Sequence, residues 1–165
     1  MSKAVKKRPV RASKDAAVRF LEFYYPIHYK AGVRVEDAMR GQDLGRHQVA
    51  ILWLIHSEGE EGRRIYRKEI ERLLGSWFEI SSAAITKAIR SMGASPLNLL
   101  TLEEAAHSGR EKVVILTREG EIFVKAMIGR GDMFIRRIIA TMSEEEIEQG
   151  LHFFKRISEI IDELE

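Results

Sequence analysis

The sequence predicts a mainly α-helical protein with one small β-hairpin, and three observations support this fold class. Apolar residues recur at helical spacing over much of the chain. Two short helical segments, 65–75 and 81–92, follow each other closely. Two short apolar runs then flank a turn at Gly109. A helix pair followed by a ribbon is the layout of a winged helix-turn-helix, whose second helix lies in the DNA major groove.

Length and composition fit one domain, or a small domain with helical extensions. Of the 165 residues, 45% are hydrophobic, which is enough for a packed core. There is no cysteine, which excludes disulfides, Cys-based zinc sites and thiol nucleophiles. No apolar run reaches the roughly 18 residues of a membrane span, and the basic start lacks the apolar stretch of a secretory signal. We therefore expect a cytoplasmic protein.

Charge is distributed unevenly, although the net charge is only +2. Residues 1–14 hold six Lys or Arg and no acid, whereas residues 143–165 hold eight acids and two bases. This asymmetry indicates that one end meets phosphate and the other does not. Residues 1–12 are interpreted as a basic flexible arm. The alternative is a solvated terminus without a partner.

The first third of the chain predicts two main helices. Residues 13–29 carry apolar side chains at helical spacing, and Pro26 is expected to end or kink that helix. A loop region with room for a short helix at 35–40 follows. The next helix, 46–57, is apolar nearly all round, which predicts a central place in the core. Residues 58–64 contain two glycines and are expected to be a loop.

The remaining elements have recognisable ends. Gly93 is expected to stop the second helix of the pair, and the β-hairpin should follow. Thr117 is the expected N-cap of a helix to about Thr141, in which Gly129 and Gly131 mark a bend or a close helix crossing. Ser143 and Glu146 form a capping box that opens the last helix. That helix carries an apolar seam at coiled-coil spacing: Ile147, Leu151, Phe154, Ile157, Ile161 and Leu164.

The second helix of the pair has two distinct faces. Its apolar face should pack on the preceding helix: Ile85, Ala88, Ile89 and Met92 against Ile70, Leu73 and Leu74. The opposite face holds small and cationic residues: Ser82, Ala83, Thr86, Lys87 and Arg90. Small residues let a helix approach base edges, while Lys87 and Arg90 can reach guanine acceptors or phosphates. The alternative is an ordinary polar helix surface, but the neighbouring helix and ribbon favour DNA reading.

From Gln42 to Leu164 the chain resembles the MarR family of winged-helix transcriptional regulators. DLGRHQVAILWLI is similar to the family's Leu-Thr-x-x-Gln segment, with Gln48 at the glutamine and Gly45 in place of threonine. RKEIERLLG and ISSAAITKAIRSM match its paired helices, and MSEEEIEQGLHFFKRI resembles its last helix. SGREKVVILTREG is similar to its Asp-Arg-Arg wing, although Ser108 and Gly109 replace the first two residues and only Arg110 remains.

The resemblance implies a homodimer whose terminal helices interlock. Residues 13–45 and 118–165 would form the helical dimerisation region, and 46–117 the winged helix-turn-helix DNA-binding lobe. The alternative is that the apolar seam packs only inside its own chain. A dimer suits this class of protein, because two recognition helices about 34–36 Å apart read two half-sites.

Arg110 is expected to insert into the DNA minor groove. The alternative is an ion pair with Glu111 or Glu119. Acids in the wing, Glu103 and Glu104, either point away from DNA or weaken its binding. The basic patch beside the helix pair holds residues that either contact phosphates or solvate the surface: Arg63, Arg64, Arg67, Lys68 and Arg72. The full set of expected DNA contacts is Arg67, Lys68, Ser81, Ser82, Ala83, Thr86, Lys87, Arg90, Arg110 and Lys112.

The sequence predicts no enzyme, no cofactor and no metal site, because the five histidines lack ligand spacing and no catalytic motif is present. Five aromatic residues either line a pocket for a small apolar or aromatic effector or belong to the core: Tyr24, Tyr25, His28, Trp53 and His56. The predicted function is a homodimeric, sequence-specific transcriptional regulator that binds a pseudo-palindromic duplex. The alternative is a winged-helix protein-interaction module with weak or no DNA binding.

Overall fold

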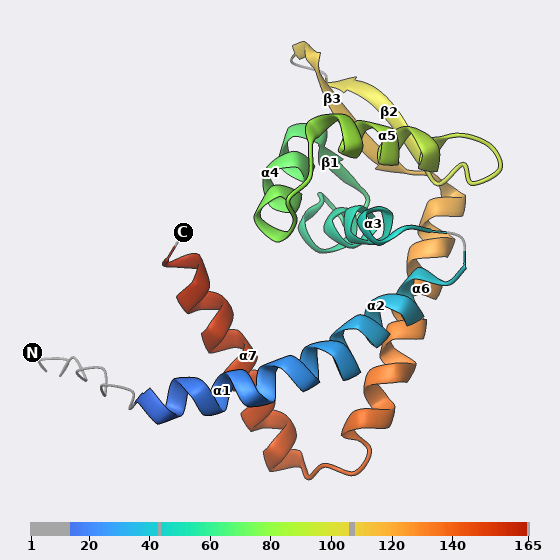
Figure 1. Ribbon diagram of the computed structural model, residues 1–165. Helices are drawn as coiled ribbons and strands as arrows, with labels where there is room; N and C mark the ends of the chain where they lie inside the picture. Colours follow the sequence, from blue (N-terminus) through green and yellow to red (C-terminus); the bar gives the residue numbers. More distant parts are fainter. Residues whose placement is uncertain (1–13, 43, 106–107, 165) are drawn as a thin grey trace, which may run out of the picture. The chain divides into compact units, whose positions relative to one another are not determined.

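The computed structural model describes residues 14–42, 44–105 and 108–164 (Figure 1). The chain divides into two units, Met1–Arg34 and Val35–Glu165, and each is described by itself. The basic arm predicted at 1–12 lies outside the described residues. No helix that the structure describes combines the length and the apolar character needed to cross a membrane.

The N-terminal helical segment runs past its proline. Helix α1 (Lys14–Ile27) contains Pro26, and a π-helical turn, η1 (His28–Gly32), leads directly into α2 (Val33–Arg40). Of the two outcomes expected at Pro26, a helix end or a kink, the end is therefore wrong, and the loop expected before the short helix at 35–40 is helical instead. A proline removes one amide donor, and the wider hydrogen bonding of a π-turn lets a helix continue beyond such an irregularity. The short helix predicted at 35–40 forms as part of α2.

The helix pair and the ribbon predicted from the sequence are present in the second unit. Helix α3 (Arg46–Glu58) comes first. Helices α4 (Arg67–Trp77) and α5 (Ser82–Gly93) follow as a pair. Strands β2 (Leu100–Ala105) and β3 (Ser108–Leu116) form the antiparallel hairpin. This part of the chain therefore confirms the predicted fold.

A third strand was not predicted. Strand β1 (Arg64–Tyr66) pairs antiparallel with β3, with Ile65 opposite Val114, which gives a three-stranded sheet in the order β1-β3-β2. The loop prediction for 58–64 is wrong at both ends, since Glu58 is the last residue of α3 and Arg64 the first of β1. A strand of three residues is too short to show an alternating pattern, and its pairing partner lies far along the chain.

One apolar core joins these elements. Helix α3 contributes Ile51, Leu52, Leu54 and Ile55, all fully buried, which confirms its predicted central place. Its Trp53 is the exception, at 38% exposed. Helices α4 and α5 pack beside α3 and the sheet, as Figure 1 shows. The inner face of α5 is part of this core.

Helices α6 (Arg118–Ile139) and α7 (Glu144–Asp162) begin as predicted. The Thr117 hydroxyl accepts a hydrogen bond from the Gly120 amide at 2.9 Å. Ser143 and Glu146 form the predicted capping box. The close crossing is confirmed at Gly131, where a Cβ would lie 3.0 Å from the Cγ of Met39 in α2, whereas a Cβ at Gly129 would meet nothing within 4 Å.

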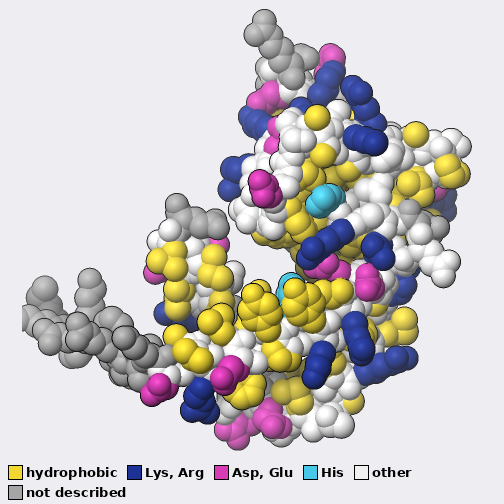
Figure 2. Space-filling model, viewed as in Figure 1, with side chains coloured by type: hydrophobic (Ala, Val, Ile, Leu, Met, Phe, Trp, Pro, Cys, Tyr) yellow, Lys and Arg dark blue, Asp and Glu magenta, His cyan; other side chains and the backbone are white. Residues whose placement is uncertain are grey.

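The apolar seam of α7 is exposed in the single chain. Leu151, Phe154 and Leu164 are 60%, 68% and 81% exposed, and α7 has no buried residue. Figure 2 shows hydrophobic side chains gathered on this helix. In the first unit, α1 likewise exposes Leu21, Phe23 and other apolar side chains. Exposed apolar surface on this scale marks an interaction site in a folded protein.

Candidate nucleic-acid interface

Helix α5 is held with its apolar face in the core. Ile85, Ile89 and Met92 are 2%, 1% and 0% exposed, so the face predicted to be apolar is buried. With Ala88 they belong to the core cluster that also contains Ile70, Leu73 and Leu74 of α4, and the main packing partners of α5 are α3 and β2. Ser81 is the N-cap, and its hydroxyl accepts a hydrogen bond from the Ala84 amide at 3.2 Å. The Ser81 side chain thus stabilises the first turn of the helix.

The outer face of α5 carries the predicted polar and cationic residues. Ser82, Ala83, Lys87 and Arg90 are exposed and Thr86 is half-buried. Neither Lys87 nor Arg90 forms an ion pair with a residue that the structure describes. These two cations are therefore available to an external anion.

Arg67 connects the two helices of the pair. From the first turn of α4, the two N–H groups of its Nη2 are shared among three acceptors: Glu71 Oε1 at 2.5 Å, Thr86 Oγ1 at 2.9 Å and Ser82 Oγ at 3.1 Å. The Ser82 hydroxyl donates to Glu71 at 2.5 Å, and the Thr86 hydroxyl donates to the Ser82 carbonyl at 2.8 Å. Sequence reasoning missed Glu71, because contacts between helices depend on their crossing geometry.

This network limits what the two hydroxyls can do. A serine or threonine hydroxyl has one proton to donate and two acceptor lone pairs. Ser82 and Thr86 each give their proton to the protein and accept one hydrogen bond from Arg67. In this arrangement each hydroxyl retains one lone pair, so it can accept a further hydrogen bond but cannot donate one.

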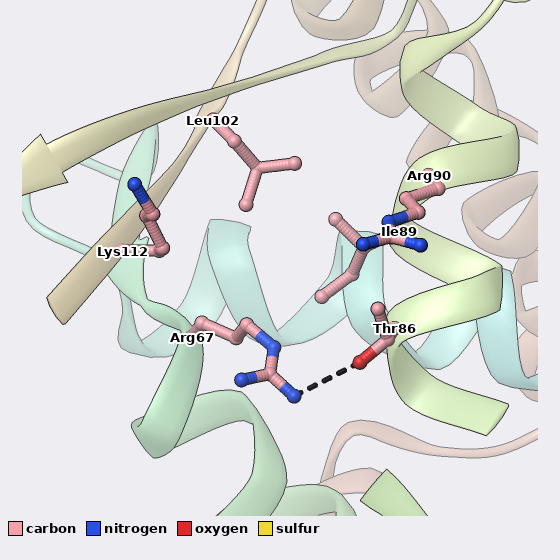
Figure 3. A pocket seen from close by; sticks show the side chains of 6 residues that line it. All are labelled: Arg67, Thr86, Ile89, Arg90, Leu102 and Lys112. Carbon is pink, nitrogen blue, oxygen red and sulfur yellow. Dashed lines mark hydrogen bonds between the residues drawn. The ribbon is translucent and has the colours of Figure 1, made fainter. Parts of the chain in front are cut away.

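A recess lies between α5 and the wing, with a volume of about 350 Å³. Figure 3 shows its lining, to which α4, α5 and the two wing strands contribute: Arg67, Thr86, Ile89, Arg90, Leu102 and Lys112. Three of these side chains are cationic and none is acidic. The recess is therefore suited to an anionic group.

Most cations of the basic patch are already paired with acids. Lys68 of α4 forms an ion pair with Glu111 of β3, and the hydrogen bond to Glu111 raises the pKa of Lys68. Arg72 pairs with Glu69 at 2.5 Å, and its hydrogen bond lowers the pKa of Glu69. The other pairs are Arg63 with Glu121, Arg64 with Glu60 and Arg67 with Glu71. Each of the five patch cations thus forms an ion pair with a carboxylate.

The two wing acids have different surroundings. Glu104 lies opposite Lys112 in the β2–β3 register, and its Oε1 is 2.7 Å from Lys112 Nζ. The hydrogen bond from Lys112 lowers the pKa of Glu104. Glu103 is expected to point to the other face of the sheet, since neighbouring strand residues alternate. It lines a recess with Arg64 and Ile115 that Glu104 also borders. The Arg110 side chain lies outside what the structure describes.

The five aromatic residues considered for an effector pocket fall into two groups. Tyr24, Tyr25 and His28 belong to the first unit, where Tyr24 and His28 stack with ring centroids 5.8 Å apart. Trp53 and His56 belong to the second unit, with centroids 6.0 Å apart. His56 also lines a cavity of about 320 Å³. None of its other lining residues was predicted as part of a pocket: Gly62, Arg63, Leu116, Glu121, Val124, Lys125 and Ile128.

Within the described ranges no three His, Asp or Glu side chains gather in a way that could hold a metal ion. The site is instead a protein surface: an anchored helix with a cationic face, a cationic recess and a β-ribbon beside it. Together with the three-helix core, these features define a winged helix-turn-helix lobe.

The comparisons with known proteins agree with this class. A MarR family protein from Bacillus stearothermophilus has a TM-score of 0.74 at 15% identity, and the match covers 92% of this chain and 99% of that chain. S. aureus MepR, solved as a mutant bound to an oligodeoxyribonucleotide, has a TM-score of 0.57 at 17% identity, and the match covers 88% of this chain and 98% of that chain. Bordetella bronchiseptica BpsR, whose DNA binding is regulated by 6-hydroxynicotinic acid, has a TM-score of 0.61 at 15% identity, covering 84% and 98%.

No protein-family model matches the chain, and no curated protein sequence matches it. The similarity to the solved structures establishes the fold. The chain has the winged-helix fold of MarR-family regulators, with helices at both ends.

Proposed function

We propose that the protein is a sequence-specific, DNA-binding transcriptional regulator that acts as a homodimer on a pseudo-palindromic duplex. The observation that carries this proposal is the outer face of α5, where Lys87 and Arg90 are exposed and unpaired with any described residue. The fold shared with MepR, which was solved on an oligodeoxyribonucleotide, supports it.

In this proposal 46–117 is the DNA-binding lobe, and α5 reads bases in the major groove. Lys87 and Arg90 contact guanine acceptors or phosphates, and the Ala83 and Thr86 methyl groups can meet a thymine methyl. The remaining lone pairs of Ser82 and Thr86 favour a base amino group, as on adenine or cytosine, because neither hydroxyl has a free proton. Arg67, Lys68 and Lys112 fix the lobe on phosphates, and Arg110 remains the predicted minor-groove residue.

The experiment that tests the proposal replaces Lys87 and Arg90 together with alanine. Affinity for a selected duplex should fall by at least about tenfold, because base or phosphate contacts are lost. The log–log salt dependence should become shallower by about 0.9 for each phosphate contact removed. Affinity and salt slope are measured by fluorescence anisotropy at several salt concentrations.

The matched control replaces two exposed cations of α6, Lys125 and Arg137, with alanine, which removes the same charge at a distance from the helix pair. The control should retain most of the affinity. Equal losses in the two double variants would show that overall charge, and not the face of α5, determines binding.

A small apolar or aromatic effector is proposed as a modulator of this binding. The regulated DNA binding of BpsR supports this part of the proposal, since its effector is a small aromatic acid. The protein-interaction alternative predicts no salt-sensitive affinity for duplex DNA of any sequence at low salt, whereas a DNA-binding protein shows it even for random duplex. The solved structures described above are regulators, and we propose no catalytic activity.

A further inference from the structure

The cations around the wing differ from those on α5 in one respect. Lys112 of β3 lies 2.7 Å from a carboxylate oxygen of Glu104, and Lys68 of α4 forms an ion pair with Glu111. Lys87 and Arg90 form no such pair with any residue that the structure describes. Figure 2 shows Lys and Arg side chains interleaved with Asp and Glu over this lobe.

Both acids, Glu104 and Glu111, lie on strands of the wing. Glu104 is the direct cross-strand partner of Lys112, which also lines the cationic recess beside α5. Glu111 is the residue before Lys112 on β3 and reaches the first turn of α4, where Lys68 lies. Both acids therefore neutralise cations that stand where DNA phosphates would approach the proposed interface.

We propose that Glu104 and Glu111 are intramolecular competitors of DNA phosphate, which reduce the affinity of the lobe for duplex of any sequence more than its affinity for its own site. This inference rests on the function proposed above. A phosphate that contacts Lys112 or Lys68 must displace a carboxylate or stand beside it, so attraction and counterion release are both reduced. The cations on α5 carry no such competitor, so base reading is retained.

The two acids would therefore raise selectivity by weakening complexes with duplexes that lack the specific site. Phosphate contacts are common to every duplex, whereas base contacts form only on the correct site. Acids that compete only for phosphate-contacting cations weaken the phosphate contacts and leave the base contacts unchanged. The ratio of specific to non-specific affinity therefore rises.

The test replaces Glu104 and Glu111 together with glutamine, which keeps the side-chain shape and removes the charge. The control replaces Glu103 and Glu61 with glutamine, which changes net charge equally. Glu103 is expected to face the other side of the same sheet, and Glu61 lies in the turn before β1; neither pairs with a cation among the described residues. Each full-length variant is titrated against a fluorescent duplex pool of random sequence at several salt concentrations, at temperatures where circular dichroism shows it folded.

We expect E104Q/E111Q to bind random duplex about three- to twentyfold more tightly than the wild type, since an exposed ion pair changes an equilibrium by up to about fivefold. The log–log salt slope should steepen by about 0.9 for each cation that gains a phosphate. The control should gain clearly less. On a duplex selected for tight binding, the gain of E104Q/E111Q should be smaller than on the random pool.

A second measurement isolates one pair. Lys112→Gln should weaken random-duplex affinity less in the wild type than in the Glu104→Gln background, because Glu104 already neutralises this lysine in the wild type. The same substitution in the Glu104→Gln background should weaken binding about two- to fivefold. Equal effects in the two backgrounds would overturn the inference.

The remaining outcomes separate the inference from the proposed function. If the wild type binds with salt-sensitive affinity and E104Q/E111Q gains nothing, or gains no more than the control, the inference fails and the function stands. If E104Q/E111Q binds and the wild type binds neither the random pool nor a selected duplex, the acids block DNA altogether, and both the proposed function and the selectivity inference fail. If no variant binds duplex at low salt, the function fails and the inference falls with it.

Discussion

Arg67 gives the helix pair its fixed geometry at the residue scale. Its guanidinium, half-buried between α4 and α5, binds Glu71 and two hydroxyls of the recognition helix. Hydrogen bonds to a charged group are stronger than neutral ones, so this contact resists sliding of one helix along the other. A residue predicted only as a phosphate contact therefore also positions the helix that reads bases.

Sequence reasoning predicted the inner face of α5 correctly, because Ile85, Ile89 and Met92 recur at helical spacing. It placed Ser82 and Thr86 on the outer face but not their partners. The polar contacts of a side chain depend on where a second helix crosses, and spacing along one helix does not contain that information. The same holds for Glu111, whose partner Lys68 lies on another element.

Glu146 gives a residue-scale prediction for pH. Hydrogen bonds from the Ser143 amide and hydroxyl lower its pKa below the ordinary 4.5. A carboxyl with a lowered folded-state pKa stabilises the fold above its unfolded pKa, and this stabilisation is lost as pH falls through the folded value. Glutamine also serves in a capping box but does not titrate. Glu146→Gln should therefore show a smaller acid-induced fall in melting temperature than the wild type.

The measurement is thermal unfolding of both proteins from about pH 7 to about pH 3, followed by circular dichroism. Glu146→Ala, which removes the cap itself, should be less stable than Glu146→Gln throughout. Parallel pH profiles for the wild type and Glu146→Gln would contradict the titration of this cap.

At the element scale, the two glycines of α6 have different roles. Helix α6 crosses α2 at Gly131, where the Met39 side chain occupies the space that a Cβ would need. Beside it, Arg130 donates hydrogen bonds to the Ala38 and Met39 carbonyls at 3.0 and 2.8 Å. These carbonyls lie in the last turn of α2. Carbonyls at the end of a helix have no helical partner, so Arg130 supplies the missing donors. Gly129 has open space around it.

Alanine at these two positions should therefore act differently. Gly129→Ala should raise the free energy of unfolding by about 0.5–1 kcal/mol, because alanine loses less conformational entropy in a helix. At Gly131 the new methyl group would lie 3.0 Å from Met39 Cγ, so the same gain should be reduced or reversed. Urea unfolding of the two variants measures the difference. An equal gain at both positions would show that the crossing tolerates a larger residue.

Elements with a long periodic pattern or a clear cap were predicted from sequence, and those without were not. Thr117 and Ser143 predicted the starts of α6 and α7 because N-cap residues satisfy free helix amides. Strand β1 was missed because its three residues are stabilised by pairing with β3 and not by a local pattern. Of the two outcomes predicted at Pro26, an end or a kink, the end was wrong, because the chain continues through a π-turn that the sequence pattern did not indicate.

At the scale of the whole molecule, the exposed seam of α7 is the feature that calls for a second chain. Leu151 and Phe154 are 60% and 68% exposed on a helix with no buried residue. Burying such side chains stabilises an association by roughly 1.5–3 kcal/mol each. The assignment of 13–45 and 118–165 to dimerisation remains a prediction that follows from the fold and from this surface.

We expect sedimentation equilibrium to give a mass near twice 18.9 kDa. Replacing Leu151 and Phe154 with glutamate should shift the protein toward monomer. Duplex binding should weaken as well, because two linked lobes bind more tightly than one. The control places the same two glutamates at Gln149 and His152, which are exposed on the opposite face of α7. A wild-type mass near 18.9 kDa at every concentration would contradict the dimer.

The junction between β1 and α4 has a consequence for regulation. Tyr66 is the last residue of the strand and Arg67 the first residue of the helix, so no linker separates them. Since β1 is hydrogen-bonded to β3, the ribbon and the first helix of the pair are joined without an intervening loop. A displacement of the ribbon would therefore be passed directly to α4. We expect an effector that changes DNA affinity to move one lobe relative to the other and not to reshape either lobe.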